Sequence, residues 1–314
     1  MFRFLLGRLL ATIPVLLVVA IAVFLILRLT PGDPAAVIAG DSATTEQIER
    51  IRAGLGLDQP IPTQFAIWAG NALRGDLGES FFFKKQVSEL IGQRIEPTLA
   101  LALCTIVLAV SIAVPLGVLA AWRHGGWLDR ALMGFSTLGF SIPVFVLGYL
   151  LIWLVSMHLG WLPVQGYRRL AEGLGPFIRH LILPSVTLSI VYVALIARVT
   201  RAAVSEALTE DYVRTARAKG LSERAVLLRH VLRNALIPIL TNVSMQLPGI
   251  FVGSFLIEVF FSIPGLGREV MLAVNRSDYP VIQAVTIYLA VITMVINLLT
   301  DLLYKAVDPR VTLK

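Results

Sequence analysis

The residues with the most capacity for chemistry lie in one charged stretch, Ser205 to Pro238, which reads SEALTEDYVRTARAKGLSERAVLLRHVLRNALIP. It is the longest strongly charged run between two apolar segments, whereas an ordinary connection has about two to eight residues. Its basic side chains, with those just before it, are Arg198, Arg201, Arg214, Arg217, Lys219, Arg224, Arg229 and Arg233. Two interpretations stay open: a solvated loop that is rich in Arg because cytoplasmic loops are, or a structured basic surface that docks on a partner.

The first half of this stretch has the spacing of a helix. Four side chains recur at four-residue steps and so share one helix face: Val204, Leu208, Tyr212 and Ala216. Glu210 lies four residues before Arg214, an orientation that supports a helix. We therefore expect helical structure to run through Glu210.

The second half begins at a glycine turn. Gly220 can take the left-handed conformation that ends a helix, and Lys219 precedes it at the negative end of the helix dipole. Ser222 is a suitable N-cap for a following helix, and Glu223 suits its first turn. The pattern predicts helix, glycine turn and helix, with a basic outer surface.

The composition is that of an integral membrane protein. Of 314 residues, 57% are hydrophobic and 15% are charged, whereas a soluble domain has about 25% charged residues. The net charge of +7 comes from Arg residues that cluster at the ends of apolar segments, so it reflects membrane topology and we expect no nucleic-acid partner. The one cysteine, Cys104, lies in an apolar segment, where a small packed side chain is the interpretation we favour.

Motifs for catalysis are missing from the sequence. It contains no Gly-x-x-x-x-Gly-Lys loop, which cradles phosphate, and no His-Glu-x-x-His. The four histidines, His124, His158, His180 and His230, do not have metal-ligand spacing. The apolar segments also lack the paired acids of a proton relay. We therefore expect no catalytic residue, metal site or cofactor in this chain.

Hydropathy predicts an all-α membrane protein with six transmembrane helices. The expected spans are Leu9–Leu27, Thr98–Trp122, Ala131–Met157, Leu181–Ala197, Ala235–Ile257 and Tyr279–Thr300. The corresponding organisation is an N-terminal transmembrane helix (1–29), an extracytoplasmic insert (30–97) and a five-helix core (98–314). The short loops opposite the charged stretch hold few basic residues, so positive-inside counting places both termini and that stretch in the cytoplasm.

The insert contains two expected helical pieces. Thr44 and Gln47 can form a capping box for a short helix that runs to about Arg52. Four breakers follow, Gly54, Gly56, Pro60 and Pro62, and then an amphipathic piece from Gln64 to Leu73. The pattern leaves two roles open for the insert: docking of a substrate-binding protein, or a passive lid over the first span.

The fifth span holds the candidate pathway or gate residues Pro248, Gly249, Gly253 and Glu258. Gly249 and Gly253 form a Gly-x-x-x-Gly pair, which lets another helix approach closely. Packing is the favoured interpretation, although close approach also suits a span that moves. Glu258 ends the span and is interpreted as an interfacial charge, with a substrate-path carboxylate as the alternative.

Several motifs resemble those of one transporter family. The charged stretch is similar to the "EAA" loop of bacterial ABC importer permeases, through Tyr212, Thr215, Ala216, Lys219 and Gly220 and the run Arg229 to Pro238. Arg214 and Arg233 depart from the general loop pattern, as is typical of one subunit type in the dipeptide/oligopeptide/nickel class. Further matches are Thr30-Pro31-Gly32-Asp33-Pro34, Phe261-x-x-Pro264-Gly265-x-Gly267, Arg276-Ser277-Asp278-Tyr279-Pro280 and Asp308-Pro309-Arg310.

The resemblance implies a multi-pass permease subunit in the bacterial inner membrane, which forms half of a pathway for di- or oligopeptides. It implies four kinds of partner: a second permease subunit, which is a paralogue in most such systems, two cytoplasmic ATP-binding subunits that hold ATP and Mg²⁺, an extracytoplasmic substrate-binding protein, and the lipid bilayer. It also implies an ATPase-coupling loop at about 199–235, here called the coupling loop. The coupling residues carried over by motif are Asp211, Tyr212, Thr215, Ala216, Lys219, Gly220, Leu221 and Arg229.

Other functions remain as alternatives. Nickel, glutathione and opine importers share this subunit plan, so the substrate is open within the class. A stand-alone secondary transporter would have inverted internal repeats, and the sequence has no convincing self-similarity. An intramembrane enzyme would need a cluster of ionisable residues inside the spans, and none is visible.

Overall fold

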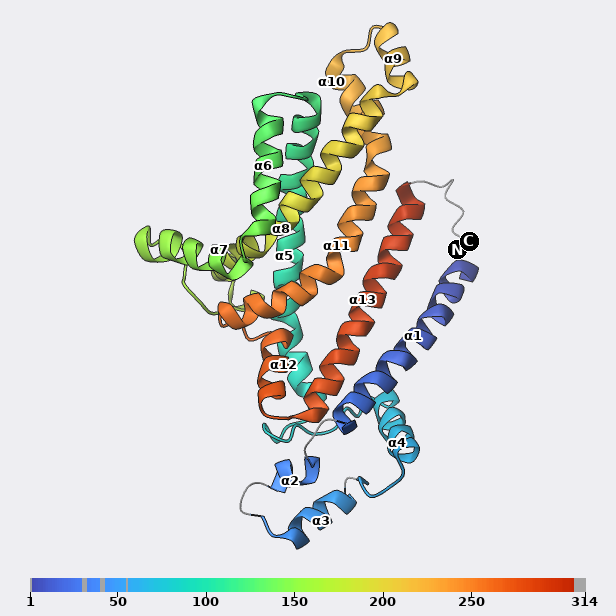
Figure 1. Cartoon of the computed structure of the whole chain (residues 1–314), viewed down its shortest axis with the longest axis vertical. Coiled ribbons are helices and arrows are strands. Elements are labelled where there is room, and N and C mark those ends of the chain that lie inside the picture. The colour runs from blue at the N-terminus through green and yellow to red at the C-terminus, as the bar shows by residue number, and fades with distance from the viewer. Residues whose placement is uncertain (1, 30–32, 40–42, 55, 308–314) are drawn as a thin grey trace. The chain divides into compact units, whose positions relative to one another are not determined.

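A computed structural model describes residues 2–29, 33–39, 43–54 and 56–307 (Figure 1). This part of the chain is built from helices and contains no strand, apart from one isolated bridge between Glu79 and Gln86. The all-α expectation is therefore confirmed for the described residues. Most of the Thr30–Pro34 motif, and all of the motif at residues 308–310, lie outside them.

The chain forms two compact units. The first consists of residues 1–96 and 265–295, and the second of residues 97–264 and 296–314. Two long helices, α5 (Val87–Trp122) and α13 (Tyr279–Val307), contribute residues to both units. Each unit is described by itself below.

The first unit is built from short helices, the whole of the long helix α1 (Phe2–Leu29) and parts of α5 and α13. Its further helices are α2 (Pro34–Ala39), α3 (Thr45–Gly54), α4 (Ile61–Leu73) and α12 (Leu266–Asn275). The capping box of α3 is confirmed, because the backbone N–H of Thr44 donates to Gln47 Oε1 at 2.9 Å and that of Gln47 donates to Thr44 Oγ1 at 3.3 Å. The expectation that Pro62 breaks the chain is wrong: it lies in the first turn of α4, where the missing N–H costs no helical bond.

Buried apolar side chains hold α5, α12 and α13 together in the first unit. The cluster consists of Val87, Leu90, Ile91, Leu266, Ala273, Val281, Ala284 and Val285. Beside it, the Asp278 carboxylate accepts hydrogen bonds from Ser80 Oγ at 2.5 Å and from the backbone N–H groups of Phe81 and Phe82 at 3.1 and 3.3 Å. The insert and the segment before α13 are thus joined by a buried polar contact as well as by packing.

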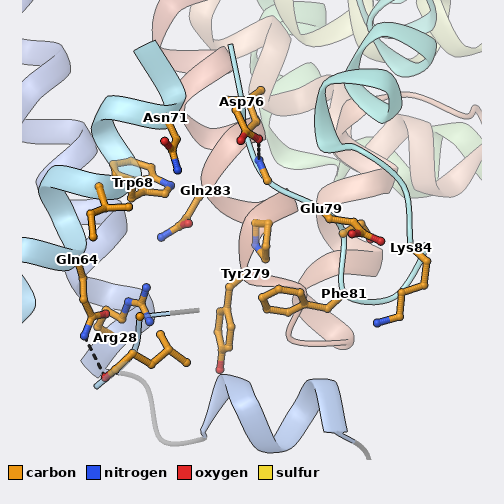
Figure 2. A pocket seen from close by; sticks show the side chains of 17 residues that line it. Arg28, Gln64, Trp68, Asn71, Asp76, Glu79, Phe81, Lys84, Tyr279 and Gln283 are labelled. Atoms are coloured by element: carbon orange, nitrogen blue, oxygen red, sulfur yellow. Dashed lines mark hydrogen bonds between the residues drawn. The ribbon is translucent and has the colours of Figure 1, made fainter. Parts of the chain in front are cut away.

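A pocket of about 370 Å³ lies in the first unit between α4, residues 76–84 and the start of α13 (Figure 2). Aromatic packing against α1 holds α4 in place. The centroid of the buried Phe24 ring lies 5.4 Å from that of Phe65 and 5.6 Å from that of Trp68. The pocket was not anticipated from the sequence, because its walls come from several separate segments.

The second unit contains the long helices α8 (Leu174–Thr209) and α11 (Leu232–Phe260), with most of α5. Shorter elements are α6 (Trp127–Ser141), α7 (Val144–Leu151), the π-helical turn Ile152–His158, the 3-10 turn Leu170–Glu172, α9 (Asp211–Ala218), α10 (Glu223–Ala225) and the π-helical turn Val226–Val231. Helix α8 packs against α11, α6 and α7 and is the central helix of this unit.

Several expected span boundaries differ from the helices observed, and the expected span Leu181–Ala197 lies within the longer α8. Helix α5 begins at Val87, before the expected start at Thr98, and Pro97 is accommodated inside it. The expected single span Ala131–Met157 is broken, since α6 ends at Ser141 and the chain bends by 106° before α7. Pro143 explains the break, because it cannot donate the helical hydrogen bond and disfavours a helical conformation at the residue before it.

Among the described residues, four helices are long and apolar enough to cross a membrane: Val87–Trp122, Leu174–Thr209, Glu223–Phe260 and Tyr279–Leu302. A fifth is obtained if the bent pair of α6 and α7 counts as one span. Helix α1 contains a shorter apolar stretch, Leu10–Ile26. The membrane character is thus confirmed, and the count of six spans stays a prediction.

Candidate functional site

The coupling loop contains a break that the sequence pattern did not predict. Helix α8 ends at Thr209, and Glu210 has an extended backbone (φ −69°, ψ 149°) before α9 starts at Asp211. The expected helix through Glu210 is therefore wrong, and Arg214 contacts Asp211 at 3.4 Å instead of pairing with Glu210. The break has a packing reason, because it turns α9 so that Val213 is buried together with Ala216.

The glycine turn after α9 is confirmed. Gly220 has φ +76°, and its N–H donates to the Arg217 carbonyl at 2.9 Å. The Leu221 N–H donates to the Ala216 carbonyl at 3.3 Å, which completes a Schellman ending of the helix. Lys219 stands directly before the left-handed residue, as expected.

The next helical segment is also capped as predicted. Ser222 Oγ accepts a hydrogen bond from the Ala225 N–H at 3.4 Å. Glu223 pairs across the turn with Arg217, whose Nε lies 2.8 Å from Glu223 Oε1. This exposed bridge joins α9 to α10 across the turn.

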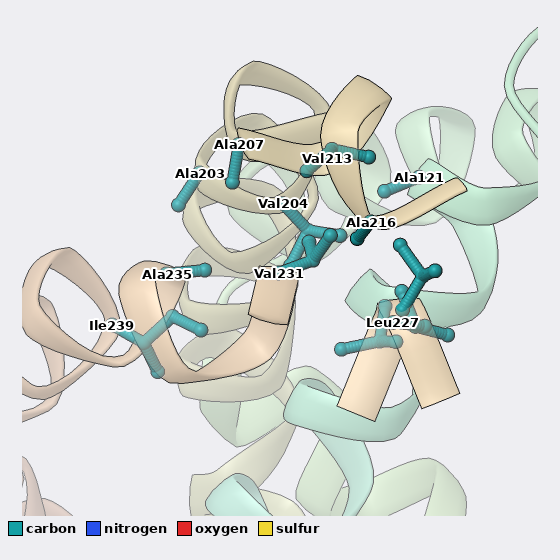
Figure 3. Packing of buried hydrophobic residues seen from close by; sticks show 12 residues of the cluster. Ala121, Ala203, Val204, Ala207, Val213, Ala216, Leu227, Val231, Ala235 and Ile239 are labelled. Carbon is teal, nitrogen blue, oxygen red and sulfur yellow. The ribbon is translucent and has the colours of Figure 1, made fainter. Parts of the chain in front are cut away.

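Apolar side chains anchor the coupling loop to the ends of the long helices (Figure 3). Val213 and Ala216, at 0% and 4% exposure, are the buried members of this cluster that come from α9. The other buried members are Val118, Ala121, Ala203, Val204, Ala207, Val226, Leu227, Val231, Ala235 and Ile239, from α5, α8, the π-helical turn and α11. The many alanines of the cluster allow the helix backbones to approach closely.

The predicted coupling residues divide into an exposed set and a packed set. Asp211, Thr215, Lys219, Gly220, Leu221 and Arg229 are exposed, as is Arg214. Tyr212 is partly buried and its hydroxyl lies 3.4 Å from the Ala207 carbonyl, while Ala216 is in the core. The exposed set can touch a partner protein directly, whereas Tyr212 and Ala216 hold α9 in place.

An ion pair at the start of the coupling loop was missed by the sequence analysis. Arg201 of α8 donates from Nε to Asp129 Oδ1 at 2.6 Å and from a terminal nitrogen to Asp129 Oδ2 at 2.9 Å. The Gly125 N–H donates to the same carboxylate at 3.0 Å, and His124 Nδ1 lies 3.0 Å from Arg201. The signal was an acidic residue in the otherwise basic turn between Arg123 and Arg130.

The glycines of α11 face α8, as their spacing predicted. A Cβ added at Gly249 would lie 3.3 Å from the Tyr192 hydroxyl, and one at Gly253 would lie 3.0 Å from Leu188 Cδ1. The tighter approach is at Gly117 of α5, where a Cβ would lie 2.6 Å from the carbonyl oxygen of Ala197. This contact escaped sequence analysis because Gly117 has no partner glycine four residues away.

Glu258 is a buried carboxyl in α11, and its interpretation as an interfacial charge or a substrate-path carboxylate stays a prediction. Its side chain has 0% exposure, and its Oε1 accepts a hydrogen bond from Thr98 Oγ1 at 2.6 Å. Pro248 lies within the same continuous helix and is partly buried. A carboxyl buried at this depth needs polar partners, and Thr98 on α5 is one of them.

Comparison with known families identifies the chain. Residues 113–313 match the model of the "Binding-protein-dependent transport system inner membrane component" family, and residues 1–102 match the model of the N-terminal part of such membrane components. The chain belongs to this family. The expectation of a membrane transport component rather than an enzyme is thereby confirmed.

Full-length relatives agree with this family. The probable peptide ABC transporter permease protein y4tP of Sinorhizobium fredii is 49% identical over 98% of both chains. The glutathione transport system permease protein GsiC of Escherichia coli O6:H1 is 43% identical over 100% of both chains. Both names belong to permease subunits, in line with the family resemblance found in the sequence.

Solved structures show the same fold in part of the chain. A chain in an inward-facing structure of the MetNI methionine ABC transporter superposes with a TM-score of 0.58. The match covers 70% of this chain and 96% of that chain at 20% identity, so it shows the fold alone.

Proposed function

We propose that this ABC importer permease subunit transports short peptides and receives the motion of its ATPase partner through the coupling loop. The observation that carries the coupling role is the geometry of α9. Its outer face exposes Asp211, Arg214, Thr215 and Lys219, while Val213 and Ala216 anchor it on the ends of α5, α8 and α11. A short element that is exposed on one face and packed on the other passes displacement to the helices beneath it, because packed contacts move together.

The proposed architecture has six spans and a cytoplasmic coupling loop. Helix α1 has 28 residues, which corresponds to about 42 Å at 1.5 Å per residue and is enough to cross a bilayer. With α1 and the bent pair counted as spans, residues 1–29 form the first helix, 30–97 an extracytoplasmic insert and 98–314 the permease core. Both termini and the loop at about 199–235 are then cytoplasmic.

The proposed complex contains four further proteins. A second permease subunit completes the pathway, two ATP-binding subunits bind ATP and Mg²⁺, and an extracytoplasmic protein delivers substrate. The chain itself holds no nucleotide in this proposal, because its sequence has no phosphate-binding loop. The proposed contact with the ATPase is made by the exposed residues Asp211, Thr215, Lys219, Gly220, Leu221 and Arg229. The proposed pathway or gate is formed by four residues of α11: Pro248, Gly249, Gly253 and Glu258.

Peptides are the substrate class best supported by the relatives. The 49% identical relative is named for peptides, and the 43% identical one is named for glutathione, which is itself a small peptide-like molecule. Glutathione is therefore the second candidate. Nickel and opines remain as alternatives from the family resemblance.

Reconstitution in vesicles tests this proposal. The chain is assembled with the second permease, ATPase and binding protein encoded beside it, and ATP-dependent uptake is measured for labelled dipeptides, labelled glutathione and radioactive nickel. Dipeptide uptake supports the proposed substrate, and uptake of glutathione or nickel alone replaces it. If the chain does not assemble with the ATPase, the proposed role of the coupling loop is wrong.

A further inference from the structure

The pocket of the first unit has polar walls that the transport function described so far does not use. Its volume of about 370 Å³ is at the small end of the range for ligand sites, about 300–1,000 Å³. Its walls come from the end of α1, the segment around Leu57, α4, residues 76–84 and the start of α13. In Figure 2, Trp68 and Asn71 project from α4 toward the side on which the Gln283 amide lies.

Gln283 is the first sign that this pocket holds a ligand. Its side chain is 7% exposed and lines the pocket. Buried polar side chains are hydrogen-bonded in the large majority of cases, because an unmade bond is costly. An amide that is buried on all sides except toward a pocket is therefore placed to bind a polar group there.

Gln64 holds one side of the pocket wall in place. Its Nε2 donates to the carbonyl oxygens of Leu57 and Gln59 at 3.2 and 2.8 Å, which fixes the amide. Its Oε1 is buried and has no hydrogen-bond partner among the described residues. This oxygen is sealed from solvent, so Gln64 contributes a fixed part of the wall and not an open acceptor.

The remaining wall chemistry indicates the class of ligand. Arg28 brings a guanidinium, whose planar donors suit a carboxylate, and it is held over the Phe24 ring at 5.0 Å. Asp76 and Glu79 line another part of the wall and suit an ammonium group. Trp68 and the buried Tyr279 provide aromatic surface for an apolar side chain.

We propose that this pocket binds a free amino acid or a dipeptide, with Arg28 on the carboxylate and Gln283 on the amide or amine groups. The small volume excludes longer peptides. This inference rests on the proposed function in one respect. The ligand is taken to belong to the same class of molecule as the transported substrate. The site itself is distinct from the residues of α11 assigned to the pathway.

Equilibrium binding of tritium-labelled leucyl-leucine to the purified transporter, in lipid nanodiscs without its binding protein and without ATP, tests the proposal. We expect saturable binding that is weakened at least about tenfold by Gln283→Leu, which removes the amide from a buried wall. Trp68→Leu, which changes a different wall, is expected to weaken binding as well. Arg74→Gln, which removes an exposed charge of the insert outside the pocket, is the matched control and is expected to bind like the wild type.

Competition experiments test the assigned groups. Unlabelled leucyl-leucine amide, which lacks the carboxylate, is expected to compete less well than the free dipeptide, and this difference is expected to disappear in Arg28→Gln. Unchanged thermal melting of the Gln283→Leu transporter shows that it is folded. If the wild type does not bind the dipeptide, or if Gln283→Leu and Trp68→Leu bind it unchanged, the pocket is not such a site.

Uptake by the complete transporter separates the two proposals. ATP-dependent dipeptide uptake without dipeptide binding at the pocket overturns this inference and leaves the proposed function intact. Binding at the pocket without uptake of any dipeptide supports this inference and overturns peptides as the transported substrate.

Discussion

The guanidinium of Arg201 binds the carboxylate of Asp129 with two hydrogen bonds, of 2.6 and 2.9 Å, and thereby joins α8 to the first turn of α6. The Asp129 side chain is 6% exposed and that of Arg201 is 22% exposed, so water screens the pair only weakly. Arg201 lies on α8, the helix that continues into α9 of the coupling loop. We interpret the pair as the contact that holds these ends of α6 and α8 in register.

Removing this ion pair is expected to destabilise the protein. Asp129→Asn leaves a largely buried guanidinium without a counter-charge, and we expect a loss of about 2 kcal/mol, measured as a lower melting temperature in detergent. Glu223→Gln, which breaks the exposed pair with Arg217, is the control and should leave the melting temperature unchanged. Equal melting of Asp129→Asn and the wild type would show that the buried pair has no structural role.

Enlarging Gly220 is expected to abolish transport while leaving the protein folded. Gly220 has φ +76°, and a Cβ added there would meet no atom within 4 Å, so Gly220→Trp introduces backbone strain of about 1–2 kcal/mol and a bulky group on the outer surface. We expect the variant to insert and fold but to lose ATP-dependent uptake. Uptake in reconstituted vesicles measures the loss of transport, and co-purification of the ATPase shows whether the complex still assembles.

Gly160→Trp is the matched control, because Gly160 also has a positive φ, +66°, and open space around it, in a loop outside the coupling loop. Both variants should lose similar stability, and only Gly220→Trp should lose uptake. A Gly220→Trp transporter that imports at the wild-type rate would remove the coupling role from this turn.

Close helix packing in the second unit predicts a graded series of alanine effects. Gly117→Ala would place Cβ 2.6 Å from both the Ala197 oxygen and Thr200 Cβ, and we expect it to cost about 1–3 kcal/mol. Gly253→Ala meets the flexible end of a leucine at 3.0 Å and should cost less. Gly134→Ala meets nothing within 4 Å and should stabilise α6 by about 1 kcal/mol. Thermal melting of the three variants ranks these costs, and a different order would contradict the packing.

The buried Glu269 predicts a dependence of stability on pH. Burial raises the pKa of this carboxyl above its ordinary 4.5, although Arg94 lies 3.1 Å away and favours the charged form. Because the pKa of Glu269 is raised in the folded state, its protonated carboxyl contributes to the stability of the fold. This contribution is complete below pH about 4.5 and is lost as the pH rises through the folded pKa. Melting temperatures of the wild type and Glu269→Gln from pH about 4 to 8 test this sign.

The Glu269→Gln variant lacks the titrating group, so this part of the decrease with rising pH should be absent from its profile. An identical pH profile for both proteins would show that Glu269 titrates equally in the folded and unfolded states.

Local sequence signals were sufficient for the membrane class, the family and the capped turns. The Gly220 ending, the Ser222 cap and the Thr44 capping box depend on residues within a few positions of one another, so their residue types specify them. The apolar runs likewise specify membrane helices, because the bilayer requires their backbone groups to be satisfied internally.

Contacts between distant segments were decided only by the tertiary structure. The break at Glu210 arises because α9 buries Val213 and Ala216 together. The four-residue spacing of apolar residues in the sequence does not predict this burial. The Arg201–Asp129 pair, the burial of Glu258 and the pocket around Gln283 likewise join residues far apart in the chain. Which side chain pairs with a buried charge depends on how the helices pack. Helix packing cannot be read from the local sequence.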